Sequence, residues 1–316
     1  MKGLLLVNKP PKISSAKFLN PLKQIFNEKH IGHGGTLDFL GEGLLIVGLG
    51  KEFTKRLKDF LTQSKKEYVV TIDLSRKSTT YDLEGVVENI NLEREITKEE
   101  IELAIVKNLL GEQEQIPPLF SARKIKGKRL YEYARENKDV KPVSKKVQLF
   151  EFEILAYDPP FLDLRLLVSS GYYVRSFARD LGEILQAGNL VTKLKRTKVG
   201  DFDIEDALNY EDFYKKIYLW GCLKGKVHNI GYRHFIMEKA KKFFLNGWVK
   251  NVLPDMLEFV LVGEIKTLDL LQKEILNFQL ASIKTFDFLI KKPKEILNDF
   301  VILPTDTTYI STKLAL

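Results

Sequence analysis

Hydrophobic residues along this chain form short runs and alternating patterns that predict strands. A run of about four to eight apolar residues is typical of a buried strand, and strict alternation is typical of a strand with one solvated face. These patterns occur at residues 3–7, 44–49, 66–74, 147–157 and 161–169. The last two segments flank Asp158, Pro159 and Pro160, which favour a tight turn, so they predict a hairpin.

Apolar positions at helical spacing predict helices between the strands. Residues 51–64 and 174–185 each carry such a pattern, with polar residues on the opposite face. Thr97 and Glu100 form a capping box, which predicts the start of a helix that continues to about Leu110. The sequence therefore predicts that strands and helices alternate along much of the chain.

The first predicted strand ends in a loop that two prolines stiffen, at residues 10–11. Lys9 therefore lies at the exit of this strand. A helix follows, which begins either near Ser14 or again at Asn20, where Pro21 would occupy its first turn.

Residues 32–43 place Asp38 among five glycines, directly before the predicted strand 44–49. Glycine allows close approaches that side chains forbid, so another part of the protein can pack directly onto this loop. Asp38 therefore fits a reactive group that is held rigidly beside a cleft. An aspartate that only caps a turn has the same spacing, and the spacing alone leaves both interpretations open.

The composition is that of an ordinary soluble protein with one large domain and an appendage, at 316 residues, 44% hydrophobic and 29% charged. Its 50 Lys and Arg exceed its 42 Asp and Glu, and the net charge of +8 suits a polyanionic partner. The single cysteine, Cys222, excludes an internal disulfide and a cysteine-cluster metal site. It is consistent with a reducing cytoplasm.

Four histidines offer few ligands for a metal ion. His30 and His33 stand three residues apart, but no second ligand pair follows, so we expect no metal site. The N-terminal apolar run is too short for a signal peptide. No apolar window of about 18 residues occurs, so we expect no membrane span and a cytoplasmic protein.

The string G-H-G-G-T-L-D-F-L-G-E-G-L at residues 32–44 resembles the catalytic-aspartate motif of the TruB-type tRNA pseudouridine synthases. Two positions depart from the family pattern: Phe39 stands where proline is usual, and Gly34 where threonine is frequent. Related families that modify ribosomal RNA carry H-R-L-D, whereas G-T-L precedes Asp38 here. The resemblance therefore favours the tRNA branch.

Further strings resemble the same family, in the same order along the chain. K-E-Y at residues 66–68 matches the family's K-x-Y, and S-T-T-Y-D-L-E-G-V-V at 78–87 is similar to its T-D-T-x-D-x-x-G-x-V, with Thr79 in place of the first aspartate. Tyr172 stands where a later family string has threonine. The later matching strings lie at residues 116–135, 169–175 and 194–202.

The resemblance implies an isomerase that detaches uracil from C1′ of its ribose and rejoins it through C5, without a cofactor. It assigns catalysis to Asp38 as nucleophile or base, to Tyr68 against the target base, and to Arg175, whose guanidinium would hold Asp38 by a two-pronged contact. A structural ion pair between Asp38 and Arg175 would have the same geometry. The residues expected to bind the flipped uridine or the RNA are Lys9, His33, Tyr173, Leu194, Lys124, Lys126, Lys128 and Arg129.

Residues 121–148 contain the densest positive charge of the chain, with ten basic residues against three acidic ones. Tyr131 and Tyr133 lie within this stretch. A charge run is usually a solvated surface, whereas basic residues interleaved with aromatic ones are typical of contact with RNA phosphates. The neighbouring motif matches favour the phosphate interpretation.

We therefore expect an α+β protein with the pseudouridine synthase fold, a mixed, mainly antiparallel central sheet flanked by helices. Residues 1–220 would form the catalytic domain, and residues 221–316 a small, divergent C-terminal region, for which a PUA-like RNA-binding domain is one option. The expected activity is isomerisation of uridine 55 in the T-loop of the tRNA T-arm, by a monomer. Two alternatives stay open: a tRNA-folding chaperone, and a relative that depends on a guide RNA and protein partners.

Overall fold

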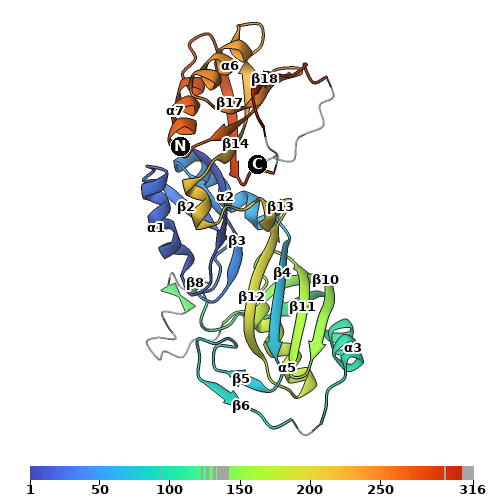
Figure 1. Cartoon of the computed structure of the whole chain (residues 1–316). Helices are drawn as coiled ribbons and strands as arrows, with labels where there is room; N and C mark the ends of the chain where they lie inside the picture. Colours follow the sequence, from blue (N-terminus) through green and yellow to red (C-terminus); the bar gives the residue numbers. More distant parts are fainter. Residues whose placement is uncertain are drawn as a thin grey trace.

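The computed structural model describes residues 1–92, 94–121, 124–125, 128–130, 133, 142–294 and 297–307, with the side chains of residues 59, 124, 125, 128 and 129 left aside. One 14-stranded sheet runs through this part of the chain. Figure 1 shows an elongated molecule in which the N-terminus lies near the junction of two parts. The larger part carries the predicted catalytic residues.

The sheet of the larger part is mixed and mainly antiparallel, as the sequence predicts. In spatial order its strands are β1 (Gly3–Lys9), β3 (Glu42–Leu49), β12 (Leu190–Val199), β4 (Lys66–Asp73), β11 (Phe161–Val168), β10 (Lys145–Asp158) and β7 (Gly111–Gln115). The predicted hairpin is confirmed, since β10 and β11 pair antiparallel. Among these strands, β12 pairs parallel with β3, and this pairing covers Lys195↔Glu42 and Arg196↔Gly43. The two strands therefore meet at one short point, next to the Asp38 loop.

In the part of the chain that the structure describes, helices α1 (Ser15–Ile25), α2 (Lys51–Gln63), α3 (Lys98–Asn108) and α5 (Val174–Leu185) accompany these strands. The capping box of α3 is confirmed, because Thr97 and Glu100 exchange hydrogen bonds between side chain and backbone. The side chain of Ser14 accepts a hydrogen bond from the backbone of Lys17, and α1 begins there. The alternative start at Asn20 is wrong, since Pro21 lies inside α1.

The smaller part contains two helices against a sheet. Its elements are β14 (Ile217–Lys226), α6 (Tyr232–Lys242), β15 (Asn246–Val252), β16 (Met256–Gly263), α7 (Ile265–Leu276), β17 (Ser282–Lys291) and β18 (Phe300–Ile302). The strand order is β18-β15-β16-β14-β17. Both helices lie on the same side of this sheet in Figure 1.

The two parts share a continuous sheet, because β17 pairs parallel with β1 at Leu4↔Leu289 and Leu5↔Ile290. The side-chain amide of Gln272 adds two 2.8 Å hydrogen bonds, to the backbone N–H and the backbone carbonyl of Lys2. Strand pairing and side-chain hydrogen bonds therefore both fix the smaller part to the first strand of the larger one.

Short elements complete the fold. They are β2 (Ile31–Gly34), β5 (Arg76–Ser78), β6 (Val87–Asn89), β8 (Lys124–Ile125), β9 (Lys128–Arg129), β13 (Phe202–Asp203) and the 3-10 helices η1 (Ile204–Asp206) and η2 (Tyr210–Tyr214). Of these, β2 pairs antiparallel with β3 and leads into the Asp38 loop. Among the residues that the structure describes, no helix has the length and apolar character needed to cross a membrane.

Candidate active site

Asp38 lies in the loop between β2 and β3, with about a third of its side chain exposed (32%). A 3.1 Å hydrogen bond from the Gly41 backbone N–H to the Asp38 carbonyl holds this loop as a turn. Gly43 has a φ of +105°, and a Cβ there would lie 2.3 Å from the carbonyl oxygen of Arg196. The predicted direct packing onto this glycine-rich loop is therefore confirmed at Gly43, where the backbone of β12 takes the place of a side chain.

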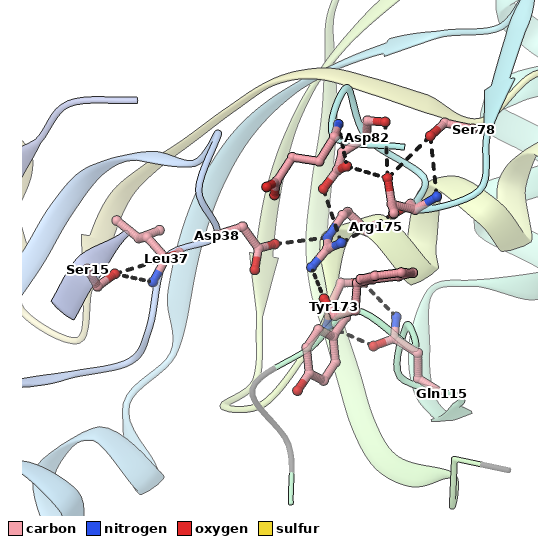
Figure 2. A network of polar contacts seen from close by, with 11 residues as sticks. Ser15, Leu37, Asp38, Ser78, Asp82, Gln115, Tyr173 and Arg175 are labelled. Atoms are coloured by element: carbon pink, nitrogen blue, oxygen red, sulfur yellow. Dashed lines mark hydrogen bonds and ion pairs between the residues drawn. The ribbon is translucent and has the colours of Figure 1, made fainter. Parts of the chain in front are cut away.

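Arg175 lies in the first turn of α5 and places its guanidinium between two carboxylates (Figure 2). Its Nε lies 2.9 Å from Asp38 Oδ2, and its Nη1 lies 3.1 Å from Asp82 Oδ2. Nη1 also donates to the Thr80 carbonyl (3.2 Å) and Nη2 to the Phe120 carbonyl (2.9 Å). The predicted two-pronged contact with Asp38 is wrong, because both terminal nitrogens are engaged elsewhere.

The charge state of Arg175 is fixed by these partners. Burial lowers the pKa of the guanidinium, but the carboxylates of Asp38 and Asp82 raise it, and the result lies above its ordinary value. Arg175 therefore stays charged at every pH at which the protein is folded. It provides a permanent countercharge for the Asp38 carboxylate.

Asp82 is the second acidic partner of Arg175, and sequence reasoning missed this role. Its Oδ1 accepts hydrogen bonds from the Thr80 hydroxyl (2.6 Å) and the Glu84 backbone N–H (3.0 Å), which leaves Oδ2 for Arg175. The S-T-T-Y-D string was the available indication. Its departure at Thr79 leaves this contact intact, because the Thr79 hydroxyl instead accepts a hydrogen bond from within the turn.

Asp38 and Tyr68 line the same cavity, which has a volume of about 720 Å³. Tyr68 lies on β4 between Leu166 of β11 and Arg196 of β12, and its ring is buried. Cavities of this size hold small ligands. This cavity therefore has room for a nucleotide with its base near both Asp38 and Tyr68.

Arg196 lines the same cavity and was also missed as a site residue. It is 1% exposed, and it donates from Nε to the Leu44 carbonyl and from Nη2 to the Gly35 carbonyl, both at 2.8 Å. Gly35 has a φ of +66°. Arg196 therefore fastens the glycine loop to β12, and its place in the K-R-T-K-V-G string was the indication in the sequence.

Lys66 is a buried cation on the same wall. Its ammonium donates to the carbonyls of Leu61 (3.0 Å) and Ser64 (3.1 Å). Burial lowers its pKa to about 8, and the positive charges of Arg196 and Lys145 contribute. Among the described residues, the hydrogen-bond partners of the Lys66 ammonium are backbone carbonyls, which carry no negative charge to compensate it.

Two residues predicted to bind RNA line the cavity. His33 projects from β2, and Tyr173 directly precedes α5. The side chain of Gln115 exchanges hydrogen bonds with the backbone of Tyr173, accepting from its N–H (2.8 Å) and donating to its carbonyl (3.0 Å). This contact fixes the chain just before Arg175 (Figure 2).

Lys9 and Leu194 occupy different positions from those residues. Lys9 has no exposed surface, and its ammonium donates to the carbonyls of Pro10 and Ile13, both at 2.8 Å. Burial lowers the pKa of Lys9 to about 8, although Asp38 raises it. Lys9 therefore fixes the loop before α1 in this structure. Leu194 lines a separate small recess beside Asp38 and Arg175.

The basic stretch gives no geometry for its predicted contacts. Lys126 lies outside the residues that the structure describes, as do the side chains of Lys124, Lys128 and Arg129. In the described part of the chain, no group of three or more His, Cys, Asp or Glu residues is arranged to hold a metal ion.

The arrangement is suited to chemistry by a single carboxylate on a bound base. Asp38 faces a cavity of nucleotide size, its orientation is fixed by Arg175 on one side and by the loop backbone on the other, and Tyr68 offers an aromatic face. An oriented, charged carboxylate can act as a nucleophile or as a base.

The C-terminal region is acylphosphatase-like. The model of the acylphosphatase family matches residues 221–302, which places the match on the smaller part of the molecule. A PUA-like domain is one option predicted for this region, whereas the family match is to acylphosphatase, which no motif described above indicates.

A solved structure matches about two thirds of the chain. A chain in the crystal structure of a Cbf5-Nop10-Gar1 complex matches 67% of this chain with a TM-score of 0.52 and 26% sequence identity. The match covers 53% of that chain, so this protein spans about half the length of that relative.

Two family models and several curated relatives match the sequence. The model of the TruB family pseudouridylate synthase N-terminal domain matches residues 23–174, and that of the tRNA pseudouridylate synthase B C-terminal domain matches residues 175–229. The tRNA pseudouridine synthase B of Flavobacterium johnsoniae is 38% identical over 68% of this chain and 95% of the relative. That of Clostridium tetani is 36% identical over 67% of this chain and 72% of the relative. Asp38 pairs with Arg175 and lines one cavity together with Tyr68, and this chain belongs to the TruB family of pseudouridylate synthases.

Proposed function

We propose that the protein is a tRNA pseudouridine synthase that isomerises uridine 55 in the T-loop. The observation that carries the proposal is the Asp38–Arg175 ion pair at the wall of a nucleotide-sized cavity. The relatives named tRNA pseudouridine synthase B support tRNA as the substrate. We infer that the protein acts as a monomer in the cytoplasm.

In the proposed reaction, the target uridine leaves the RNA stack and enters the cavity, because Asp38 cannot reach a stacked base. The N1–C1′ bond breaks, uracil turns, and a C5–C1′ bond forms. The proton on C5 is released, and N1 gains a proton. Asp38 supplies the carboxylate oxygen that starts this sequence, and Arg175 orients that oxygen and provides its countercharge.

Tyr68 has two proposed roles. Its ring supplies an apolar face against the flipped base, and its hydroxyl removes the C5 proton or acts through a water molecule. His33, Tyr173 and Leu194 are proposed to contact the displaced nucleotide. Lys9 supports the loop from within.

The decisive experiment replaces Asp38 with asparagine. Pseudouridine formation should fall below detection while tRNA affinity stays within about threefold, because affinity is spread over many stacking and phosphate contacts. Single-turnover release of tritium from C5-labelled uridine in a T-arm stem-loop measures the chemistry, and filter binding measures the affinity.

Tyr68→Phe is the matched variant, because it keeps the aromatic face and removes only the hydroxyl. Binding should persist, and the rate should fall by about a hundredfold if the hydroxyl transfers the proton. Tritium release by Asp38→Asn at the wild-type rate would overturn the catalytic assignment.

The same assay separates the two alternatives. A guide-RNA-dependent enzyme would need protein partners and a guide, so tritium release by the purified chain alone would exclude it. For a chaperone, the folding of a misfolded tRNA would be as fast with Asp38→Asn as with the wild type. That result, together with an absence of tritium release by the wild type, would favour the chaperone over the isomerase.

We also propose that residues 1–220 form the synthase domain and residues 221–316 a C-terminal region. β14 begins at Ile217 and pairs with β16 and β17, so this strand lies at the boundary. The span of the acylphosphatase family match, which begins at residue 221, supports the same division.

For the C-terminal region, we propose a second function, the hydrolysis of acyl phosphates to a carboxylate and phosphate. The family match over residues 221–302 carries this proposal. The N-terminus of α6 lies within the matched residues and supplies a proposed anion site. Gly231 caps this helix with a φ of +76° and without a side-chain hydrogen bond, and its first turn contains no acidic residue but does contain Arg233. A cation in the first turn adds to the positive end of the helix dipole and favours a bound anion.

Asn251 is a second polar group at the same edge of the sheet. Asn251 lies one residue from the end of β15, and this end pairs with the start of β16. The start of β16 also pairs with the end of β14, which leads into α6. Asn251 is 7% exposed, and its side-chain oxygen accepts no hydrogen bond in the structure. That oxygen can accept a hydrogen bond from a water molecule that attacks the phosphoryl group.

Hydrolysis of acetyl phosphate by the purified full-length protein tests this second function. Arg233→Ala and Asn251→Ala should each lower the rate by at least tenfold, whereas Lys241→Ala, an exposed change on the same helix, should leave it within twofold. Asp38→Asn should hydrolyse acetyl phosphate normally, because it lies in the other part of the molecule. An inactive wild-type protein would refute the activity, and a fully active Arg233→Ala variant would refute the site.

A further inference from the structure

One serine fastens the Asp38 loop to helix α1. The Ser15 hydroxyl accepts a hydrogen bond from the Leu37 backbone N–H and donates one to the Leu37 carbonyl, both at 3.0 Å. A hydroxyl has one proton to donate and lone pairs to accept, so it can make both contacts at once. Figure 2 shows these contacts on the side of Asp38 that faces away from Arg175.

The two contacts act on the peptide groups on either side of Leu37. The Leu37 carbonyl belongs to the peptide group whose N–H is that of Asp38, so Ser15 sets the plane from which the Asp38 side chain projects. The peptide group after Asp38 is held by the hydrogen bond from Gly41 to the Asp38 carbonyl. Asp38 is therefore held by its backbone on both sides.

The contact is well protected from water. Ser15 is 1% exposed, and Leu37 is 3% exposed within the hydrophobic core. The helix that carries Ser15 is also fixed at its start, because the neighbouring Ser14 caps it. The hydroxyl therefore transmits the position of a rigid helix to a loop whose own glycines impose little rigidity.

We propose that Ser15 is a positioning residue for Asp38: it holds the carboxylate at the place where it meets both Arg175 and the target base. This inference rests on the proposed role of Asp38 in uridine isomerisation. Displacing a reacting group by about 1 Å can cost about a hundredfold in rate. Loss of the Ser15 hydroxyl should therefore affect the chemical step more than it affects stability.

Ser15→Ala tests the proposal in the full-length protein. We expect single-turnover tritium release at saturating T-arm RNA to fall by about ten- to a hundredfold, with the dissociation constant of the RNA within threefold of the wild type. Ser15→Thr keeps a hydroxyl and should restore most of the rate. A purely structural serine would leave the rate of the folded enzyme unchanged.

Ser64→Ala is the matched control, because Ser64 is also buried and donates a single hydrogen bond to the Phe60 carbonyl (2.7 Å). Both alanine variants should lower Tm by a few degrees, but only Ser15→Ala should lose turnover. Equal rates in the two variants would overturn the inference. So would a Ser15→Ala variant whose RNA affinity falls by the same factor as its rate.

A second measurement needs no RNA and separates this inference from the proposed function. If Ser15 places Asp38 against Arg175, then Asp38→Asn should change the unfolding equilibrium constant at least threefold less in a Ser15→Ala protein than in the wild type. Additive effects would refute the positioning role. Coupling without any tritium release by the wild type would sustain it and refute the isomerase instead.

Discussion

Two buried arginines hold the Asp38 loop or its side chain, and they differ in what they bind. Arg175, from α5, contacts the carboxylates of Asp38 and Asp82, whereas Arg196, from β12, donates only to the backbone carbonyls of Leu44 and Gly35. Each fixes the Asp38 loop or its side chain. Their electrostatic consequences are opposite.

The Arg175 side of Asp38, made of Asp38, Asp82 and Arg175, pairs positive with negative charge. On the Arg196 side, made of Arg196, Lys66 and the exposed Lys145, the side chains donate to backbone carbonyls, and no ion pair of theirs occurs among the described residues. Buried positive charge beside a cavity attracts anions. We therefore expect the Arg175 side to orient the reacting carboxylate and the Arg196 side to attract the phosphates of the RNA.

Arg175→Lys should have the largest effect, a loss of at least a hundredfold in single-turnover rate at unchanged net charge. An ammonium cannot bridge two carboxylates while it also donates to the carbonyls of Thr80 and Phe120. Tritium release at saturating T-arm RNA measures this. A near wild-type rate would mean that charge alone suffices on the Arg175 side.

Arg196→Lys should act mainly on stability. A lysine can satisfy one of the two carbonyls that Arg196 now binds, and a buried carbonyl without a partner costs about 1 to 3 kcal/mol. Urea denaturation should show a loss of free energy of unfolding in this range, with a smaller loss of turnover. If turnover fell as far as in Arg175→Lys without a loss of stability, the distinction between the two sides would fail.

The lowered pKa of Lys66 predicts that the free energy of unfolding rises at alkaline pH. Its pKa is lowered from 10.5 to about 8 by burial and by the charges of Arg196 and Lys145. Below pH 8 the ammonium is charged in the folded and unfolded states alike, so folding carries the full cost of burying the charge. Between pH 8 and 10.5 the unfolded chain binds more protons, so the free energy of unfolding rises with pH.

The size of this increase in the free energy of unfolding follows from the size of the pKa shift of Lys66. Between pH 7.5 and 9.5 Lys66 should add roughly 2 kcal/mol to the free energy of unfolding. Lys66→Met should lack this contribution, and urea denaturation of both proteins at the two pH values measures the difference. Identical pH dependence in the two proteins would show that Lys66 is not buried as a charged group.

The smallest effect should come from the basic stretch. Replacing Lys124, Lys126 and Lys128 with alanine should weaken tRNA binding and reduce the slope of log affinity against log salt concentration by about 0.7 to 0.9 for each lost phosphate contact. Filter binding between about 50 and 200 mM salt measures the slope. An unchanged slope would mean that these lysines do not contact phosphates and that the Arg196 side of the cavity attracts them instead.

The sequence predicted the parts of this site that depend on local patterns. The capping box of α3, the strand before α2 and the Asp38 loop are each specified within a few residues. The pairing of Asp38 with Arg175 was expected only because both residues lie in family strings. Nothing in the spacing of two residues 137 positions apart (175 − 38) indicates contact.

The contacts that were missed are those that link distant segments through the backbone. Ser15 bonds to Leu37, and Arg196 to Leu44 and Gly35. Every residue carries a backbone carbonyl, so the type of residue does not show whether its carbonyl accepts such a hydrogen bond. No pattern of side chains in the sequence therefore predicts these contacts. The two-pronged contact failed for a related reason, since the competing partners of Arg175 include backbone carbonyls.

The pairing of β1 with β17 affects how the protein folds during its synthesis, because the two strands lie far apart along the chain. β1 carries the leucines 4, 5 and 6, which are buried in the finished molecule, and β17 covers the side of β1 that β3 leaves open. A ribosome delivers β1 first and β17 some 280 residues later. Leu208 covers the later part of this edge, through hydrogen bonds to Leu6 and Asn8, so the part at Leu4 and Leu5 stays open until β17 is made. An open strand edge can pair with another nascent chain, and we expect β17 to protect β1 against such aggregation.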